Sequence, residues 1–214
     1  MVYSVKEIFY TLQGEGAQAG RPAVFCRFAG CNLWTGLERD RDNAVCQFCD
    51  TDFIGTDGEG GGKFKTADEL ASAVKAAWPS DIKTGDGKPM VVCTGGEPLL
   101  QLDDALIEAF HAAGIEIAVE SNGTVLPPKG IDWLCISPKI GAEIIVTGGQ
   151  ELKLVYPQEG GEPAQFEHLD FEHFFLQPMD SPVQAENTAA AVDYCKTHPK
   201  WHLSLQTHKL VGIP

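Results

Sequence analysis

The sequence predicts an α/β fold, an incomplete and open parallel β/α barrel with about six core strands and few helices. Short apolar runs of four to six residues recur along the chain, as expected for strands covered on both faces. Three segments with helix signals lie between these runs, and this alternation favours a parallel sheet with right-handed crossovers. Three helices are too few for a complete eight-fold barrel, which typically takes about 250 residues, and the chain has 214. A doubly wound sheet is the alternative fold.

The predicted core strands are the apolar runs bounded by turn or helix signals. They span residues 23–28, 90–94, 116–120, 133–137, 151–155 and 173–177. Residues 203–205 are expected to add a short strand near the end of the sequence. Each run matches the length of a typical strand, which is about five or six residues.

The predicted helices are identified by their capping residues and their apolar spacing. They span residues 66–78, 103–113 and 187–198. Thr66 and Glu69 form a capping box at the start of the first helix, because each side chain can bond to the amide near the other. The second helix is followed by Gly114, a natural left-handed cap, and the third stops at Pro199.

The composition indicates one globular domain spanning residues 1–214. Hydrophobic residues make up 43% of the chain and charged residues 21%, which is unlike a disordered or membrane protein. The formal charge of −14 argues against nucleic acid as a partner, because neutralising phosphates requires a basic surface. The first residues lack the basic and apolar segments of a secretory signal, and no apolar run suits a membrane helix. We therefore expect a cytoplasmic protein with no membrane partner.

Three cysteines, Cys31, Cys46 and Cys49, follow the first core strand with the spacing C-x14-C-x2-C. Two thiolates separated by two residues can reach one metal centre, because the turn between them directs both sulfurs to one side. A structural zinc site uses four protein ligands, so three thiolates also fit an iron–sulfur cluster with one open position. The alternative is a zinc-stapled binding protein without catalytic activity. The other four cysteines are predicted to be small buried apolar side chains: Cys26, Cys93, Cys135 and Cys195.

Polar residues follow several of the predicted strands at the point where each strand ends. After the second core strand comes Thr94 in the sequence TGGEP, where two glycines let the backbone approach a ligand closely. Similar groups begin at Glu120, Ser137 and Gln177, after the third, fourth and sixth strands. Each group alone is an ordinary turn signal. The carboxyl ends of parallel strands form the ligand face of α/β proteins, so together these groups predict one site.

These motifs resemble the radical S-adenosylmethionine superfamily and, within it, the 7-carboxy-7-deazaguanine synthase family. The open barrel, the three cysteines after the first strand and GGEP after the second match the superfamily. The narrower similarity is carried by FYTLQGEG at 9–16, VFCRFAGCNLW at 24–34, CQFCDT at 46–51 and QTHK at 206–209. One departure is Thr35, which stands where the superfamily has its middle cysteine, so that fourteen residues separate Cys31 from Cys46.

The resemblance implies a four-iron, four-sulfur cluster on Cys31, Cys46 and Cys49, with S-adenosylmethionine bound to the open iron. It implies conversion of 6-carboxy-5,6,7,8-tetrahydropterin to 7-carboxy-7-deazaguanine in 7-deazapurine (queuosine) biosynthesis. This reaction is a radical ring contraction with loss of ammonia, initiated by a 5′-deoxyadenosyl radical. A magnesium ion, a flavodoxin-like electron donor and a homodimer are also implied. A glycyl-radical activating enzyme of the same superfamily is the alternative function.

The resemblance also implies roles for individual residues by their positions in the motifs. Expected contacts to S-adenosylmethionine are Phe48, Cys49, Asp50, Gly96, Glu97, Ser137, Pro138, Lys139, Gln177, Pro178, Met179 and Asp180. Expected substrate contacts are Leu12, Gln13, Gly14, Glu15, Arg27, Thr94 and Pro214. Arg27 offers a planar fork for a carboxylate. Thr51 is the implied magnesium ligand, and Asp50 either competes for the ion or caps the turn.

Overall fold

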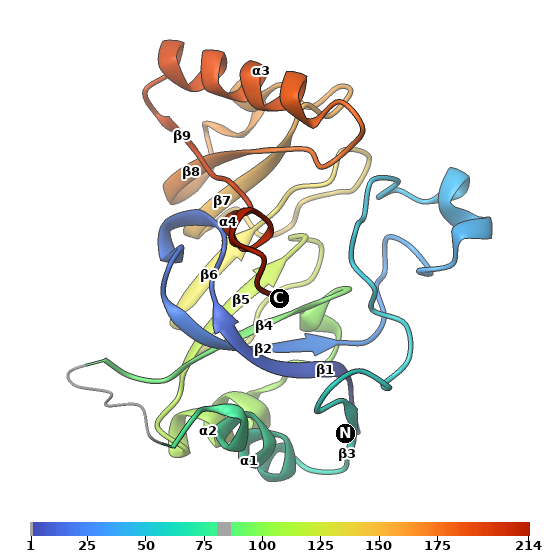
Figure 1. The fold of residues 1–214 in the computed structure, drawn as a ribbon, viewed down its shortest axis with the longest axis vertical. Coiled ribbons are helices and arrows are strands. Elements are labelled where there is room, and N and C mark those ends of the chain that lie inside the picture. Colours follow the sequence, from blue (N-terminus) through green and yellow to red (C-terminus); the bar gives the residue numbers. More distant parts are fainter. Residues whose placement is uncertain (1, 81–86) are drawn as a thin grey trace.

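A computed structural model describes residues 2–80 and 87–214 of the chain. Its strands are β1 (Tyr3–Leu12), β2 (Pro22–Phe28), β3 (Gly62–Phe64), β4 (Met90–Gly95), β5 (Glu116–Ser121), β6 (Trp133–Ile136), β7 (Gly148–Tyr156), β8 (Asp170–Pro178) and β9 (Trp201–Leu203). Its α-helices are α1 (Ala67–Ala77), α2 (Asp104–Ala112), α3 (Gln184–Thr197) and α4 (Thr207–Val211). The strands form one curved sheet, in the order β3-β1-β2-β4-β5-β6-β7-β8-β9 (Figure 1).

The strands β2 and β4 to β9 run parallel to one another, as the sequence predicts for the core strands. The antiparallel pairs of β1 with β2 and β3 were not predicted. In β1 the polar residues Lys6 and Glu7 interrupt the apolar run, so the sequence shows no continuous buried strand there. The predicted final strand begins two residues early, because Trp201 is buried edge-on against Phe174 with ring centroids 5.4 Å apart.

The three predicted helices are confirmed, and their ends show how each one is capped. The Thr66 side chain accepts a hydrogen bond from the Glu69 amide at 3.1 Å, while the Glu69 carboxylate accepts from Lys65, one residue before the position a capping box predicts. The third helix begins at Gln184, three residues early, because Asn187 lies inside its first turn and donates to the Met179 carbonyl. None of the helices that the structure describes is long and apolar enough to cross a membrane.

All three long helices pack on the outer face of the sheet. Leu70 of α1, Phe110 of α2 and Ala191 of α3 share one apolar core with Cys26 of β2 and Cys93 of β4. A doubly wound sheet would need helices on both faces, so the structure is the open barrel instead. Cysteine burial follows the prediction at three positions and is only partial at the fourth: Cys26, Cys93 and Cys135 are buried, and Cys195 is half-buried.

The inner face of the sheet changes in polarity along the strands. A small apolar cluster of Ala23, Met90, Val92 and Ala118 lies toward the amino ends of β2, β4 and β5. Nearer the carboxyl ends of these strands the side chains are polar. The adjacent strands are still paired there. This arrangement leaves the carboxyl ends of the strands free to form a polar site.

Candidate active site

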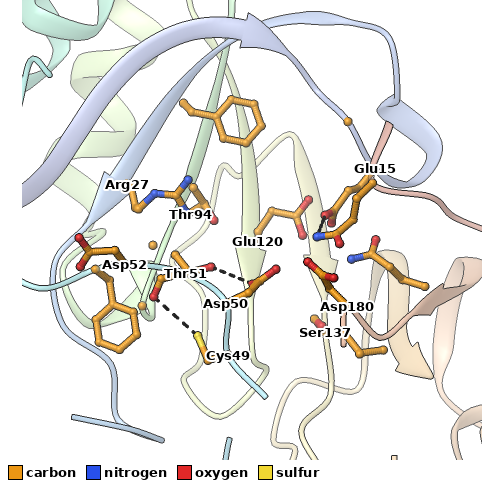
Figure 2. Close-up of a pocket in the computed structure, with 18 of the residues that line it drawn as sticks. Glu15, Arg27, Cys49, Asp50, Thr51, Asp52, Thr94, Glu120, Ser137 and Asp180 are labelled. Atoms are coloured by element: carbon orange, nitrogen blue, oxygen red, sulfur yellow. Dashed lines mark hydrogen bonds between the residues drawn. The ribbon is translucent and has the colours of Figure 1, made fainter. Parts of the chain in front are cut away.

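A cavity of about 470 Å³ lies at the carboxyl ends of the strands on the inner face of the sheet. Its wall contains every residue for which the sequence predicts a role in the site, except Glu97 and Pro138. Figure 2 shows labelled side chains that converge from β2, β4 and β5 and from the loops that follow the cysteines. The sequence-predicted site residues are therefore brought together by the fold.

The three predicted cluster cysteines all line this cavity. A hydrogen bond from the Cys46 thiol lowers the pKa of Cys49 to about 6, and the same interaction raises the pKa of Cys46. Burial raises the pKa of Cys31, whose sulfur accepts a hydrogen bond from the Leu33 amide at 3.5 Å. Three thiols on one cavity wall are a donor set suited to an iron–sulfur cluster.

The fourteen-residue insertion folds back, so Cys31 lines the same cavity as the Cys46–Cys49 pair. Its 3-10 helix (Glu38–Asn43) carries Arg41, whose guanidinium stacks 4.0 Å from the Trp34 ring centroid. Arg41 also donates to the carbonyls of Gln47 at 2.8 Å and Cys49 at 3.0 Å. Arg41 thus fixes the insertion to the loop that bears the other two cysteines.

Thr35 occupies the position of the superfamily's middle cysteine and takes no part in the cavity wall. Its exposed hydroxyl donates to Asp40 at 2.8 Å and accepts from the Leu37 amide at 3.2 Å. The residue therefore orders the insertion locally.

The GGE turn after β4 approaches the Cys31 loop closely. A Cβ at Gly96 would lie 2.1 Å from the Gly30 carbonyl oxygen and 2.9 Å from the Cys31 Cβ. The Glu97 side chain is fully buried and accepts hydrogen bonds from the Ser121 hydroxyl at 2.9 Å and the Asn122 amide at 2.8 Å. Burial raises the pKa of Glu97. Glu97 thus braces the loop after β5, while Gly96 presents backbone to the cavity.

The loop after β6 places Ser137 and Lys139 on the cavity wall. The Lys139 ammonium donates to the Ser137 hydroxyl at 2.6 Å, and burial lowers the pKa of Lys139. Pro138 lies behind this wall, where its carbonyl accepts from the buried Gln158 amide at 3.3 Å. The four residues that end β8 and follow it also line the cavity: Gln177, Pro178, Met179 and Asp180.

Arg27 and Thr94 are register partners on β2 and β4, and both line the cavity. The Arg27 Nε donates to Glu7 at 2.7 Å, and both side chains are more than two-thirds buried. Within the described residues the two Nη groups of Arg27 make no hydrogen bond. They remain able to bind a carboxylate in the cavity.

Glu15 and Glu120 share one cation, the Lys153 ammonium. Lys153 lies 2.7 Å from Glu15 and 2.8 Å from Glu120, and its side chain is 3% exposed. The Gln13 amide donates to Glu120 at 3.2 Å, and the Gln206 amide donates to Glu15 at 3.1 Å. This wall is rich in carboxylate oxygens that face the cavity (Figure 2).

The QTHK segment closes one side of the cavity. Thr207 donates to the Gly14 carbonyl through its amide at 3.0 Å and its hydroxyl at 2.8 Å. Lys209 lies 2.8 Å from Asp50 and 2.6 Å from Asp180, so it joins the cysteine loop to the end of β8. Burial opposes ionisation of Asp50, but its hydrogen bond with Lys209 lowers the Asp50 pKa.

Thr51, the residue expected to bind magnesium, lines the cavity beside Asp50 and donates to its carboxylate at 3.4 Å (Figure 2). Within residues 2–80 and 87–214, no three Cys, His, Asp or Glu side chains converge on a single ion position. A magnesium ion commonly takes only one or two protein ligands and completes its shell with substrate oxygens and water. The threonine hydroxyl is an oxygen donor of the kind magnesium uses.

Four charged residues of this cavity were not predicted from the sequence: Lys6, Glu7, Asp52 and Lys153. Lys153 lies in a run that reads as a buried apolar strand, and Glu7 lies in a strand that was missed. Side chains two residues apart in a strand share a face. Lys153 and Val155 therefore both face the cavity, as do Glu7 and Phe9. Alternation along β7 shows which side chains share a face with Lys153, but it does not show that this face lines a cavity.

Several proteins of known name are similar to this chain over its whole length. One from Caulobacter vibrioides is 63% identical over 214 residues, and one from Bordetella pertussis is 63% identical over 217 residues. One from Bacteroides thetaiotaomicron is 44% identical over 213 residues. In all three comparisons 100% of both chains is covered, and each relative is named 7-carboxy-7-deazaguanine synthase.

A solved structure supports the fold assignment. The crystal structure of QueE from Escherichia coli matches with a TM-score of 0.71 at 22% identity, covering 96% of this chain and 94% of that one. No family model matches the sequence. The full-length identities are decisive, and this chain belongs to the 7-carboxy-7-deazaguanine synthase family.

Proposed function

We propose that this chain converts 6-carboxy-5,6,7,8-tetrahydropterin to 7-carboxy-7-deazaguanine, with loss of ammonia, in 7-deazapurine (queuosine) biosynthesis. One observation carries the proposal: the three motif cysteines share a single cavity with Arg27 and Glu15. The family likeness supports the same reaction. The glycyl-radical activating and zinc-stapled alternatives are set aside, because the whole chain matches the synthase family.

The family implies a four-iron, four-sulfur cluster and S-adenosylmethionine as cofactors. When bound, they supply a 5′-deoxyadenosyl radical that takes a hydrogen atom from the substrate. Cys31, Cys46 and Cys49 would hold the cluster, since their three thiols line one wall. Gly96 offers backbone polar groups to the methionine moiety, and its missing side chain is what allows the turn to approach Cys31. The surrounding protein orients both reactants and excludes water.

Further contacts to S-adenosylmethionine are proposed for cavity residues from three segments of the chain. Phe48 and Asp50 come from the cysteine loop, Ser137 and Lys139 from the loop after β6. The residues from Gln177 to Asp180 come from the end of β8. The side chains of Glu97 and Pro138 lie outside the wall, so any contribution of these two residues is made by holding neighbouring loops in place.

The opposite side of the cavity fits the substrate. Arg27 keeps two Nη groups for the substrate carboxylate, next to Thr94. Gln13 and Glu15 supply donors and acceptors for the polar edge of the pterin. Leu12, Gly14 and Pro214 complete this part of the wall. Thr51 is the proposed protein ligand of a magnesium ion whose remaining ligands are substrate oxygens and water.

Turnover of the reconstituted protein tests the proposed function. Anaerobic iron and sulfide are added, followed by S-adenosylmethionine, dithionite, magnesium and the tetrahydropterin, and the product is identified by mass. The expected product is 7-carboxy-7-deazaguanine, and its absence in a preparation that still cleaves S-adenosylmethionine would contradict the assignment. Omitting magnesium should lower the rate if Thr51 contributes to an ion site.

Single cysteine variants test which thiols hold the cluster. Cys31→Ala, Cys46→Ala and Cys49→Ala should each abolish reductive cleavage of S-adenosylmethionine and lower bound iron and sulfide, because each removes one of three ligands. Cys195→Ala is the matched control, since this half-buried cysteine lies on α3 away from the cavity. Normal iron content in any of the first three variants would show that its thiol is not a ligand.

The remaining proposals concern the assembly. We propose that residues 1–214 act as one catalytic domain, that two copies form a homodimer, and that a flavodoxin-like protein delivers the electron. The homodimer and the electron donor rest on the family resemblance of the sequence motifs, and the single domain rests on the composition. Light scattering gives the oligomeric state, and replacing dithionite by a reduced flavodoxin in the turnover experiment identifies a competent donor.

A further inference from the structure

Lys153 occupies a central position in the cavity wall, although neither the motifs nor the expected roles include it. Its ammonium lies 2.7 Å from the Glu15 carboxylate and 2.8 Å from the Glu120 carboxylate. Glu15 belongs to the connection after β1, Glu120 to β5 and Lys153 to β7. One buried cation therefore ties together three parts of the chain that meet only in the folded protein.

The surroundings of Lys153 keep the ion pairs charged. Burial alone lowers the pKa of Lys153, but the acidic side chains around it reverse this effect and raise the pKa well above its usual value. Burial likewise raises the pKa of Glu15, and the charge and hydrogen bond of Lys153 more than reverse that change. A buried ammonium is tolerated because it is paired and hydrogen-bonded.

The two carboxylates keep acceptor capacity for a ligand. Each carboxylate has about four acceptor sites. Within the described residues, side chains donate two bonds to Glu120, from Lys153 and Gln13, and two to Glu15, from Lys153 and Gln206. Both residues line the cavity, so the remaining acceptor sites are available to N–H groups of a bound molecule.

We propose that Lys153 is a positioning residue for substrate recognition: it holds Glu15 and Glu120 where both can accept hydrogen bonds from the amino and ring N–H groups of an aminopyrimidinone. The aminopyrimidinone class rests on the proposed function. Without the ammonium, two carboxylates in one buried wall repel each other and turn apart or take up protons. The geometry that reads the heterocycle is then lost, while the cysteine side of the cavity stays intact.

Binding and turnover of Lys153→Met and Lys153→Arg, in the reconstituted enzyme with S-adenosylmethionine, test the proposal. Binding is measured with 6-carboxypterin, the fluorescent oxidised analogue of the substrate. Lys153→Met should weaken this binding and raise KM by about tenfold or more, because charged hydrogen bonds of about 1.5–3 kcal/mol are lost. Cleavage of S-adenosylmethionine without pterin should fall less than pterin affinity does. Lys153→Arg keeps the charge and should restore part of the affinity.

Lys200→Met is the matched control, since the exposed Lys200 donates to the Glu167 carbonyl, lies over the Phe174 ring and does not line the cavity. Unchanged pterin affinity in Lys153→Met overturns the proposal. So does a parallel loss of pterin binding and substrate-free cleavage with a lower melting temperature, which indicates a general structural role. Should Lys153→Met fail to fold, full wild-type affinity in Lys153→Arg would contradict precise positioning. If the wild type neither binds nor converts pterin, the proposed function itself fails.

Discussion

At the scale of single residues, close contacts in the site are made by glycines, whose backbone can approach its neighbours because no side chain intervenes. Gly96 lies against Gly30 and Cys31, and Gly14 lies against the His208 ring, with a hypothetical Cβ 2.2 Å from its Nδ1. Gly96 has an ordinary φ, so another residue there is excluded by the neighbouring backbone and not by its own conformation. These contacts set how closely the GGE turn approaches the Cys31 loop and how closely the QTHK segment approaches Gly14.

Gly96→Ala should therefore displace the Cys31 loop. Forcing a methyl group into a packed site typically costs about 1–3 kcal/mol, and here the obstacle is a carbonyl oxygen that cannot rotate away. The expected result is a lower melting temperature together with reduced iron content after reconstitution. Gly62→Ala in β3 is the control, because its nearest neighbour, the Phe64 ring, would lie 3.8 Å away. Full iron loading of Gly96→Ala would contradict this account.

Which residues could be predicted from sequence depended on whether their chemistry was visible locally. The cysteine spacing and the QTHK tail could be recognised as site motifs from the sequence, because thiols and clustered polar groups are unusual at strand ends. Lys153 could not be recognised, because a lysine in an apolar strand reads as solvent-facing until the curvature of the sheet is known. The burial of the Glu97 side chain depends on Ser121 and Asn122, which are distant in sequence.

At the scale of structural elements, the C-terminal segment with α4 closes a sheet that is otherwise open. It bonds to Gly14 through Thr207 and to Glu15 through Gln206, while Thr11 donates to the Pro214 carbonyl at 2.9 Å. Residues 205–214 include no fully buried residue, so the segment adds little to the core. Its contribution is to the wall of the cavity, and neither its helix nor these contacts could be predicted from five residues of weak helical pattern.

Removing residues 206–214 should separate binding from folding. We expect the melting temperature to fall by less than about 8 °C, which corresponds to about 2 kcal/mol for a chain of this size. The value of kcat/KM should fall at least about 100-fold, because the wall around Glu15 is opened to water. Leu210→Ser is the control, since this side chain is 73% exposed and does not line the cavity. Retained activity in the shortened chain would show that the segment is dispensable.

At the scale of the whole molecule, the acidic charge makes stability depend on how its carboxylates ionise. The folded-state pKa of Glu15 is below its ordinary value of 4.5, so its stabilising contribution is complete above that pH and is lost as pH falls through the folded pKa. Burial raises the pKa of Glu97 and Glu151, so their contributions have the opposite sign and diminish as pH rises. The acid limb of the stability curve is the sum of these effects.

The variant Glu15→Gln isolates the contribution of the Glu15 carboxylate to stability. At pH 7 the variant should be destabilised by about 2 kcal/mol, the typical value of a hydrogen bond to a charged group. The difference from wild type should begin to shrink as pH falls below 4.5, where the unfolded chain takes up a proton at Glu15. It should disappear below the lowered folded-state pKa, where the native carboxylate is protonated as well. Denaturant unfolding at several pH values measures it, with Glu108→Gln on the exposed face of α2 as the control. A difference that is constant with pH would refute the role of ionised Glu15.

The fold class could be predicted because it depends on strand length and on alternation with helices, both readable along the chain. The complete sheet could not, because β1 and β3 join it antiparallel through residues that are neither continuously apolar nor regularly alternating. The path of the fourteen-residue insertion was equally unpredictable, since it depends on Arg41 stacking on Trp34.

In Figure 2 Arg27 lies on one side of the cavity and Glu15 on the other, with Glu120 between them, so the guanidinium and the Glu15 carboxylate belong to different parts of the wall. A ligand with an anionic group at one end and N–H donors at the other has a single favourable binding orientation between them. Turned end for end, it would set anion against anion, a mismatch that costs several kcal/mol in a desolvated interface. The distribution of charge along the cavity thus decides which atom of the ligand faces the three cysteine sulfurs.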